Sequence, residues 1–252
     1  MTVRAEHEVA HGRYLAGLDA ETAWGWGTPA GRRRAERRAR LIADAARLRP
    51  GMRALEIGCG TGLFTSYFAA SGAEILAVDI SPDLLALARQ RPMPSTRVRF
   101  QLAKFEDLQE EPFDAVVGSS VLHHLELDTA LPQLVRLLRP GGWCSFAEPN
   151  MLNPQVFLER HVPYLRKRLH VSPDETAFVR WGFARRLLRH GLDDVRITPF
   201  DWLHPFTPPP LIGSVLAVSR VLERLPGVCE FAGSLAISGR KPHMANAAQN
   251  AR

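Results

Sequence analysis

Three glycines at alternate positions, Gly58, Gly60 and Gly62, directly follow a short apolar run and precede an amphipathic stretch. Glycine adopts left-handed dihedral angles and lets a ligand approach the backbone closely. The free N–H groups of the next helix would lie just behind such a turn. About 20 residues further on, Asp79 ends a second apolar run, where a carboxylate can accept hydrogen bonds from both hydroxyls of a ribose. This spacing predicts a nucleoside-binding site.

Two ligand classes use a glycine turn between a strand and a helix. Dinucleotide oxidoreductases place a third glycine where Leu63 stands here, because close helix packing then lets the helix N-terminus hold a pyrophosphate. Glu56 also lies beside this turn. A carboxylate there repels a pyrophosphate but attracts a cationic amino group, so the turn favours a ligand with an ammonium group over a dinucleotide.

The elements that position this turn alternate regularly between strand and helix. We expect strands over 53–58, 74–79, 97–102, 113–118, 142–148, 194–200 and 231–238. Helices are expected over 62–70, from Ser81-Pro82, and over 128–138 and 174–190. Such alternation predicts a parallel sheet with helices on both faces, and its ligand site lies at the carboxyl ends of the strands.

The sequence divides into three parts. Residues 1–48 read as a cap over the site, or as a loosely packed extension, followed by an arginine-rich helix over 29–48. Residues 49–241 form the main domain, which is irregular over 149–172 and has an insertion at about 201–230. That insertion begins with prolines and continues as a helix with an apolar face over 211–225. The tail at 242–252 is expected to be disordered.

Composition points to a cytosolic globular protein. The chain has 252 residues, of which 46% are hydrophobic and 23% charged. No apolar run reaches the roughly 20 residues that span a bilayer, and the N-terminus has no secretory signal pattern. Three widely spaced cysteines predict neither a disulfide framework nor a zinc site. The net charge of +6 allows an acidic substrate or an anionic surface as partner, or simply a solvated basic exterior.

Four stretches together resemble the class I S-adenosylmethionine-dependent methyltransferases, in particular their small-molecule group. They are LEIGCGTG (55–62), VDIS (78–81), FDAVVGSSVLHHL (113–125) and LRPGGWCSFAEPN (138–150). The resemblance is close over about 50–150 and loose to about 240. It implies a Rossmann-like α/β fold with a seven-stranded, mostly parallel sheet whose last strand is antiparallel. It also implies S-adenosylmethionine as cofactor.

The resemblance also implies roles for individual residues. Gly58 and Gly60 make room for the methionine portion, and Glu56 helps to hold its ammonium group. Asp79 takes the ribose hydroxyls and Ile80 packs on the adenine. The full set of implied cofactor contacts is Glu56, Gly58, Cys59, Gly60, Asp79, Ile80, Phe105, Ser119 and His124.

The adenine end departs from the family pattern at Lys104. Many members carry Asp there, which accepts a bond from the adenine amino group, whereas lysine cannot accept it. Either Glu106 or Asp107 substitutes, or adenine is recognised more loosely.

Methyl transfer from a sulfonium is an in-line displacement that depends on alignment in a dry pocket. A hydroxyl nucleophile also needs a base, and His123 or His124 can supply one near neutral pH. His124 could instead pack on the cofactor. Glu148 is the third catalytic candidate. Pocket roles or loop capping remain open for Glu148 and Asn150, and His11 and Tyr14 in the cap are further alternatives.

The acceptor is inferred partly from missing motifs. No Asn/Asp-Pro-Pro-Tyr/Phe motif follows 113–118, and no cysteine has a Pro-Cys context there, so a nucleic-acid substrate is not expected. We expect O-methylation of a small, moderately hydrophobic or amphiphilic acceptor. The helix at 211–225 would wall its pocket, lie on a membrane surface or simply join the core. An RNA or protein methyltransferase, a non-catalytic S-adenosylmethionine-binding module and a dinucleotide oxidoreductase are the alternatives.

Overall fold

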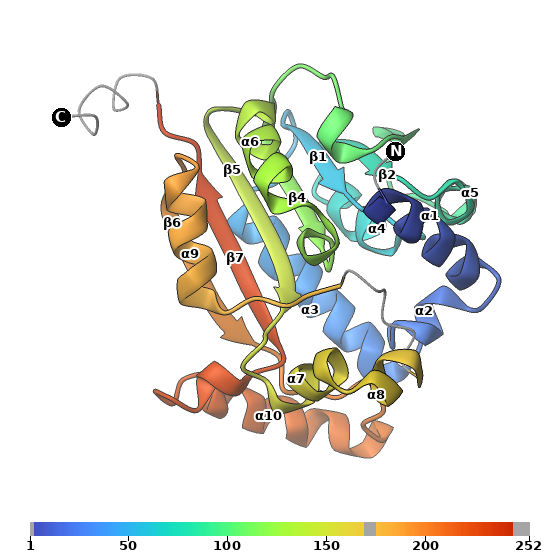
Figure 1. The fold of residues 1–252 in the computed structure, drawn as a ribbon, viewed down its shortest axis with the longest axis vertical. Coiled ribbons are helices and arrows are strands. Elements are labelled where there is room, and N and C mark those ends of the chain that lie inside the picture. The colour runs from blue at the N-terminus through green and yellow to red at the C-terminus, as the bar shows by residue number, and fades with distance from the viewer. Residues whose placement is uncertain (1–2, 169–174, 244–252) are drawn as a thin grey trace.

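A seven-stranded sheet forms the centre of the molecule (Figure 1). The computed structural model describes residues 3–168 and 175–243. The strand order is β3-β2-β1-β4-β5-β7-β6. In chain order the strands are β1 (Arg53–Ile57), β2 (Glu74–Asp79), β3 (Val98–Leu102), β4 (Phe113–Ser119), β5 (Leu138–Pro149), β6 (Asp193–Phe200) and β7 (Ser234–Arg240).

Strand directions follow the expected fold class. β1 pairs in parallel with β2 and β4, β2 with β3, and β4 with β5. The last strand, β7, is antiparallel to both β5 and β6 and lies between them. The prediction of a mostly parallel sheet with an antiparallel last strand is therefore confirmed. Strand order reverses at β1, and a ligand crevice opens at this switch point in such sheets.

Helices cover both faces of the sheet because alternate strand residues are apolar on each side. Leu55 and Ile57 of β1 join one core with α6 (Leu127–Leu137) and α9 (Arg180–Arg189). Ala54 joins the other core with α3 (Pro29–Ala45), α4 (Leu63–Ala69) and α5 (Pro82–Gln90). Their beginnings match sequence signals: Thr28 and Ser81 each cap a helix whose first residue is proline.

The N-terminal residues form two helices, α1 (Val3–Ala16) and α2 (Ala20–Ala23). α1 packs closely on α5, since a Cβ on Gly12 would lie 2.4 Å from Ser81 Oγ. Leu15, Ala20 and Leu84 form a small apolar cluster at this contact. The segment is thus seated on the main domain, while the division of the chain into domains stays a prediction.

The segment after β5 differs from expectation. Residues 149–172 were expected to be irregular, yet α7 (Pro154–His161) and α8 (Pro163–Arg168) form there. The reason is local, because the Asn153 side chain accepts bonds from Gln155 N and Val156 N and so caps α7. The helix expected over 174–190 is α9, beginning at Arg180.

The remaining elements are short or lie near the carboxyl ends of the parallel strands. The helix expected over 211–225 is α10 (Ile212–Leu222), and it lies with α7 and α8 beyond the end of β5 (Figure 1). The 3-10 helices are η1 (Phe105–Asp107), η2 (Leu122–His124), η3 (Pro209–Leu211) and η4 (Cys229–Phe231). Most of the tail predicted to be disordered, 244–252, lies outside the described residues. Among the helices of the described ranges, none is both long and apolar enough to cross a bilayer.

Candidate active site

A cavity of about 1090 Å³ opens at the carboxyl ends of β1, β2 and β4. Its walls come from the glycine turn, the end of β2, the loops carrying η1 and η2, the N-terminal helices, α7 and the loop at 201–206. This is the edge of the sheet where the sequence places the site. The volume is of the size that small-molecule sites have.

The glycine turn and Asp79 are joined directly. Gly58, Gly60 and Gly62 all have positive φ, of 65°, 52° and 76°. Gly60 N donates to Asp79 Oδ2 at 2.8 Å, and Ser81 N donates to Asp79 Oδ1 at 2.8 Å. Burial raises the pKa of Asp79, and these backbone donors oppose the rise. Hydrogen bonds thus fix the carboxylate next to the turn, where the sequence expects a ribose.

The N-terminal segment lies over this turn. A Cβ on Gly60 would meet the Trp24 ring at 3.2 Å. Glu21 accepts from Thr61 Oγ1 at 3.0 Å and also pairs with Arg91, whose Nε donates to Thr61 O at 3.0 Å. Contacts on the side chain and backbone of the turn therefore seat α2 and Trp24 at the mouth of the cavity.

Glu56 does not line the cavity, although the resemblance implies a contact with the cofactor ammonium group. It is 1% exposed and faces Thr65 of α4. Burial raises the pKa of Glu56 to about 8, and the charge of Asp79 adds to the rise. A mostly protonated acid beneath α4 is a weak partner for an ammonium group, so the implied role stays a prediction.

Arg38 is a cavity residue that the sequence reasoning missed. It lies on α3, is 3% exposed, and its buried Nε has no hydrogen-bond partner among the described residues. Its guanidinium lies 5.6 Å from the Trp26 ring and 5.8 Å from the Phe200 ring. Burial and the nearby Arg34 lower the pKa of Arg38 to about 10, so it stays charged at neutral pH.

A sequence signal for Arg38 did exist. It falls on the same face of α3 as Ala35, Ala39 and Ile42, which are buried, and Arg34 lies one turn before it in the same cavity wall. A cation on an otherwise apolar helix face predicts a buried charge that binds a ligand. The neighbouring Arg34 is neutralised by Asp201 at 2.8 Å, which leaves Arg38 as a cation for a ligand.

The expected adenine end is assembled from Ile80 and residues 103–107, all of which line the cavity. η1 is held in place by Gln133 of α6, whose Nε2 donates to Phe105 O at 3.2 Å and Leu108 O at 2.8 Å. Lys104, Glu106 and Asp107 lie together here, so both carboxylates suggested as substitutes for the missing Asp are at hand. Ser119 Oγ also lines the cavity and has no hydrogen-bond partner among residues 3–168 and 175–243.

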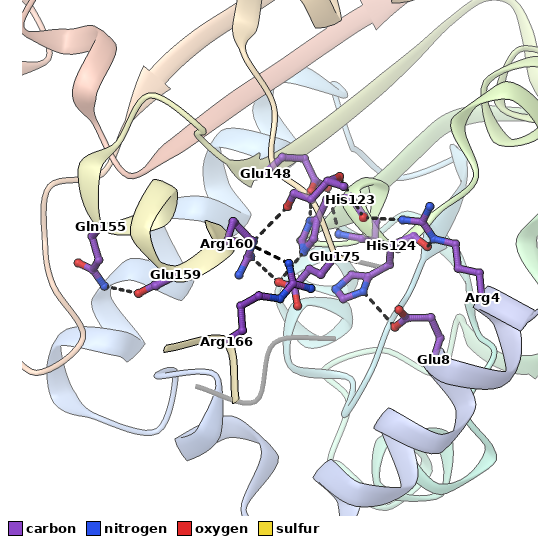
Figure 2. Close-up of polar contacts among 12 residues, drawn as sticks. Arg4, Glu8, His123, His124, Glu148, Gln155, Glu159, Arg160, Arg166 and Glu175 are labelled. Atoms are coloured by element: carbon purple, nitrogen blue, oxygen red, sulfur yellow. Dashed lines mark hydrogen bonds and ion pairs between the residues drawn. The ribbon is translucent and has the colours of Figure 1, made fainter. Parts of the chain in front are cut away.

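The two histidines after β4 differ in their surroundings (Figure 2). His123 is 2% exposed, with Nδ1 2.5 Å from Glu148 Oε2 and Nε2 3.3 Å from Glu175 Oε1. Glu148 Oε1 accepts from Val121 N at 3.0 Å and Leu122 N at 2.9 Å. Glu175 in turn pairs with Arg160 of α7. His123 therefore lies within a chain of alternating charges.

These charges decide the protonation of His123. Burial alone lowers the pKa of His123, but Glu148 and Glu175 outweigh it and raise it to about 9. Although burial raises the pKa of both carboxyls, His123 holds each below its ordinary value. With both ring nitrogens donating, His123 cannot accept a proton from a substrate. These contacts favour a positioning role for His123 and Glu148, and the catalytic role expected for both stays a prediction.

His123, His124 and Glu175 also bring potential metal-ligand atoms within 4.8 Å of one another. Both nitrogens of His123 already face carboxylates, and Glu175 already pairs with Arg160. This is a closed ion-pair network and lacks the open coordination position that a catalytic metal needs.

Comparison with known proteins places the central part of this cavity in a family. Residues 55–146 match the family model described as a methyltransferase domain. This stretch carries the glycine turn, Asp79, η1 and both histidines, and the resemblance noted in the sequence is confirmed over it.

Two relatives and one solved structure illustrate the similarity. A ubiquinone biosynthesis O-methyltransferase of Xanthomonas axonopodis pv. citri is 38% identical over 109 residues, 41% of this chain and 46% of that protein. The protein of that name from Xylella fastidiosa is 34% identical over 158 residues, 58% and 63% of the two chains. The N-methyltransferase NodS of Bradyrhizobium japonicum, solved with S-adenosyl-L-homocysteine, has a TM-score of 0.55 at 20% identity, covering 86% and 90% of the two chains.

The matches leave a large part of the cavity without a counterpart in the family model. The matched segments cover less than two thirds of either relative, and Arg38, Trp24 and Trp202 lie outside residues 55–146. The loop at 201–206 lines the cavity and α10 does not, so the structure does not support the alternative in which this helix walls the pocket. Trp202 Nε1 is buried without a hydrogen-bond partner in the described chain.

Three further candidates, Asn150 and the cap residues His11 and Tyr14, differ in their surroundings. Asn150 is 1% exposed and outside the cavity, and its Nδ2 donates to Glu230 O and Ala232 O at 2.7 Å each. It thus ties β5 to η4, as the loop-capping alternative suggests. In the cap, His11 lines the cavity, whereas Tyr14 is 47% exposed and does not.

We predict that His123 stabilises the fold only while it is protonated. Its raised pKa makes the contribution complete below about pH 6.5 and removes it as the pH rises through about 9. His123→Asn should lower the free energy of unfolding at pH 7 by about 3–5 kcal/mol, because two carboxylates lose their buried cation. Urea unfolding from pH 6 to 10 measures both effects.

The control for this prediction is His190→Asn, which removes a histidine outside the cavity. The difference between wild type and His123→Asn should shrink above pH 9, whereas that for His190→Asn should stay small throughout. A difference independent of pH would contradict the assignment of a protonated His123.

Proposed function

We propose that this protein is an S-adenosylmethionine-dependent methyltransferase that transfers a methyl group to an oxygen atom of a small, moderately hydrophobic acceptor. The observation that carries the proposal is the glycine turn of a methyltransferase domain opening into the cavity, with Asp79 bonded to Gly60 N. The two O-methyltransferase relatives support oxygen as the acceptor atom.

Each part of the cofactor has a chemical counterpart in the cavity. Asp79 would accept from the ribose hydroxyls, and Ile80 with residues 104–107 would contact the adenine. The methionine portion would lie along the glycine turn. Its carboxylate needs a cation, and Arg38 is a buried guanidinium that lacks a partner among the described residues. We therefore assign Arg38 to that carboxylate.

The chemistry requires alignment and one proton transfer. When bound, S-adenosylmethionine would supply an activated methyl group to the acceptor oxygen, and the electrons of the broken carbon–sulfur bond would stay on sulfur. The hydroxyl proton passes to His124, which lines the cavity with its side chain 23% exposed. Trp24, Trp26 and Trp202 would keep water away from this step.

The same walls suggest the acceptor class. Trp202, Leu203 and Phe206 give the cavity an apolar side suited to an aromatic or alkyl group. The unpartnered N–H of Trp202 is available to an oxygen on that group. An RNA or protein acceptor and a non-catalytic binding module remain the alternative functions, and a cytosolic location belongs to the proposal.

Calorimetry and methyl labelling test the proposed function. The protein should bind S-adenosylmethionine and not NAD. With labelled cofactor and a cell extract, label should enter small molecules and not the RNA or protein fraction. Binding of NAD alone would overturn the cofactor assignment, and label in RNA or protein would favour the corresponding alternative.

We predict that Arg38→Met weakens S-adenosylmethionine binding without destabilising the unliganded protein. Hydrogen bonds to charged groups contribute about 1.5–3 kcal/mol, so the dissociation constant should rise about 10- to 150-fold. The unliganded variant should be as stable as wild type or more stable, because it no longer buries an unpaired charge. Calorimetry and thermal unfolding measure the two effects.

The matched control is Arg33→Met on the same helix, where the Arg33 side chain is 64% exposed. It should change neither quantity. Equal affinities for Arg38→Met and wild type would remove Arg38 from the cofactor site.

We further propose that α10 and its flanks contact a membrane surface from which an amphiphilic acceptor is taken. Leu211, Val218, Val221 and Leu225 are 43–57% exposed, and Arg220 and Arg224 lie exposed among them. Exposed apolar side chains bordered by cations suit an anionic interface.

Vesicle binding tests this surface. The protein should co-sediment with phosphatidylglycerol vesicles more than with phosphatidylcholine vesicles. Val218→Glu with Val221→Glu should abolish the binding, whereas Ser214→Glu, which adds a charge but removes no apolar group, should reduce it less. Absence of co-sedimentation with either vesicle would contradict the proposal.

A further inference from the structure

Helix α1 reaches the residue proposed as the base from outside the methyltransferase domain. His124 Nδ1 lies 3.0 Å from Glu8 Oε2, and the two side chains are 23% and 15% exposed (Figure 2). Both residues line the cavity. Glu8 is thus the carboxylate nearest to His124 in the ion pairs of the described chain, and it comes from a segment 116 positions earlier in the sequence.

The same helix also holds the backbone that carries this imidazole. Arg4 Nε donates to His124 O at 2.6 Å, and Arg4 Nη2 donates to His123 O at 2.9 Å (Figure 2). Arg4 and Glu8 are four residues apart, so both project from one face of α1. One helix face therefore contacts both the main chain and the side chain of His124.

His123 and His124 differ in the contacts of their ring nitrogens, and this difference allows His124 to accept a proton. Both His123 nitrogens face carboxylates, whereas only Nδ1 of His124 does. His124 Nε2 makes no hydrogen bond with residues 3–168 or 175–243. His124 Nδ1 lies within ion-pair distance of Glu8 but is not aligned for a hydrogen bond in this structure, so Glu8 acts on the ring as a nearby negative charge. That charge favours the proton on Nδ1, and Nε2 then carries the lone pair and can accept a substrate proton.

We propose that Glu8 is a positioning residue for catalysis, which fixes His124 in the Nδ1–H tautomer and stabilises the imidazolium formed during methyl transfer. Proton transfer from the acceptor hydroxyl to His124 Nε2 accompanies formation of the oxygen–carbon bond and cleavage of the carbon–sulfur bond. Glu8 keeps its charge and takes no proton. This inference rests on the proposed O-methyl transfer. It implies that Glu8 contacts His124 only while α1 is packed against the rest of the protein.

Other charges near His124 bear on its response to pH. The His123 ring lies 4.2 Å from the His124 ring, and Arg4 contacts the His124 carbonyl. Glu175 and Asp79 also act on His124 electrostatically. These groups remain when Glu8 is changed, so a comparison of Glu8 variants isolates the effect of the one carboxylate in direct contact with the ring.

The test compares Glu8→Gln with Glu6→Gln, an identical change at an exposed position of the same helix. Methyl transfer from labelled S-adenosylmethionine to an alkylcatechol is the assay. Glu8→Gln should lower kcat about tenfold or more, leave KM for S-adenosylmethionine nearly unchanged, and move the acid limb of the kcat/KM profile to lower pH, because the imidazolium loses its counter-charge. Glu8→Asp should restore part of kcat, and Glu6→Gln should match wild type.

Nitrogen-15 spectra of the histidine rings give a readout that needs no acceptor. Wild type should show the Nδ1–H tautomer for His124, and Glu8→Gln should shift the ring toward the other tautomer. If wild type transfers no methyl group to any acceptor, the proposed function fails while these spectra still test the pairing. If wild type is active and Glu8→Gln behaves like Glu6→Gln in both rate and pH profile, the catalytic role of Glu8 is overturned.

Discussion

A single buried carboxylate, Glu148, holds the centre of this site together. Its oxygens accept bonds from Val121 N, Leu122 N and His123 Nδ1, so it fixes both the backbone and the first imidazole after β4. Val121 in turn packs where a Cβ on Gly58 would lie, 2.4 Å from Val121 Cγ2. The position of η2, and with it His124, therefore depends on one group at the end of β5. Since that group is 0% exposed, removal of its cation would leave an uncompensated charge in the core.

The buried charges of the cavity divide into satisfied and unsatisfied ones. The network of Glu148, His123, Glu175 and Arg160 alternates in sign and neutralises itself, which suits a structural scaffold. Arg38 has aromatic rings beside it and feels the charges of Asp201 and Glu148, but it forms no direct ion pair within the described chain, which costs stability in the unliganded protein. The contrast separates groups that shape the site from groups that await a ligand.

Most of the fold could be predicted from the sequence, because its signals are local. Apolar runs of strand length, proline after Ser81 and the glycine turn each report on a few neighbouring residues, and β2 matches its predicted bounds at 74–79. The site was only partly predictable, since contacts between distant segments have no local signature. Nothing near Glu8 indicates that its partner is His124. Likewise, the order of charged residues after β4 does not reveal that His123 is enclosed by two carboxylates while His124 is not.

Some walls of the cavity come from the stretch that matches the family model, and others come from segments outside it. Residues 55–146, which match the methyltransferase family model, supply most of the groups that the proposed cofactor would use, whereas Arg38 lies outside that stretch. The cap residues Glu8 and Trp24, together with the loop carrying Trp202, surround the other side of the space. These segments are also tied to each other, since Thr28 Oγ1 donates to Pro205 O at 2.5 Å and Arg34 pairs with Asp201. Because these contacts join the N-terminal segment to the loop at 201–206, a change in the position of one segment should also change the position of the other. The shape of the cavity that an acceptor meets should therefore depend on both segments.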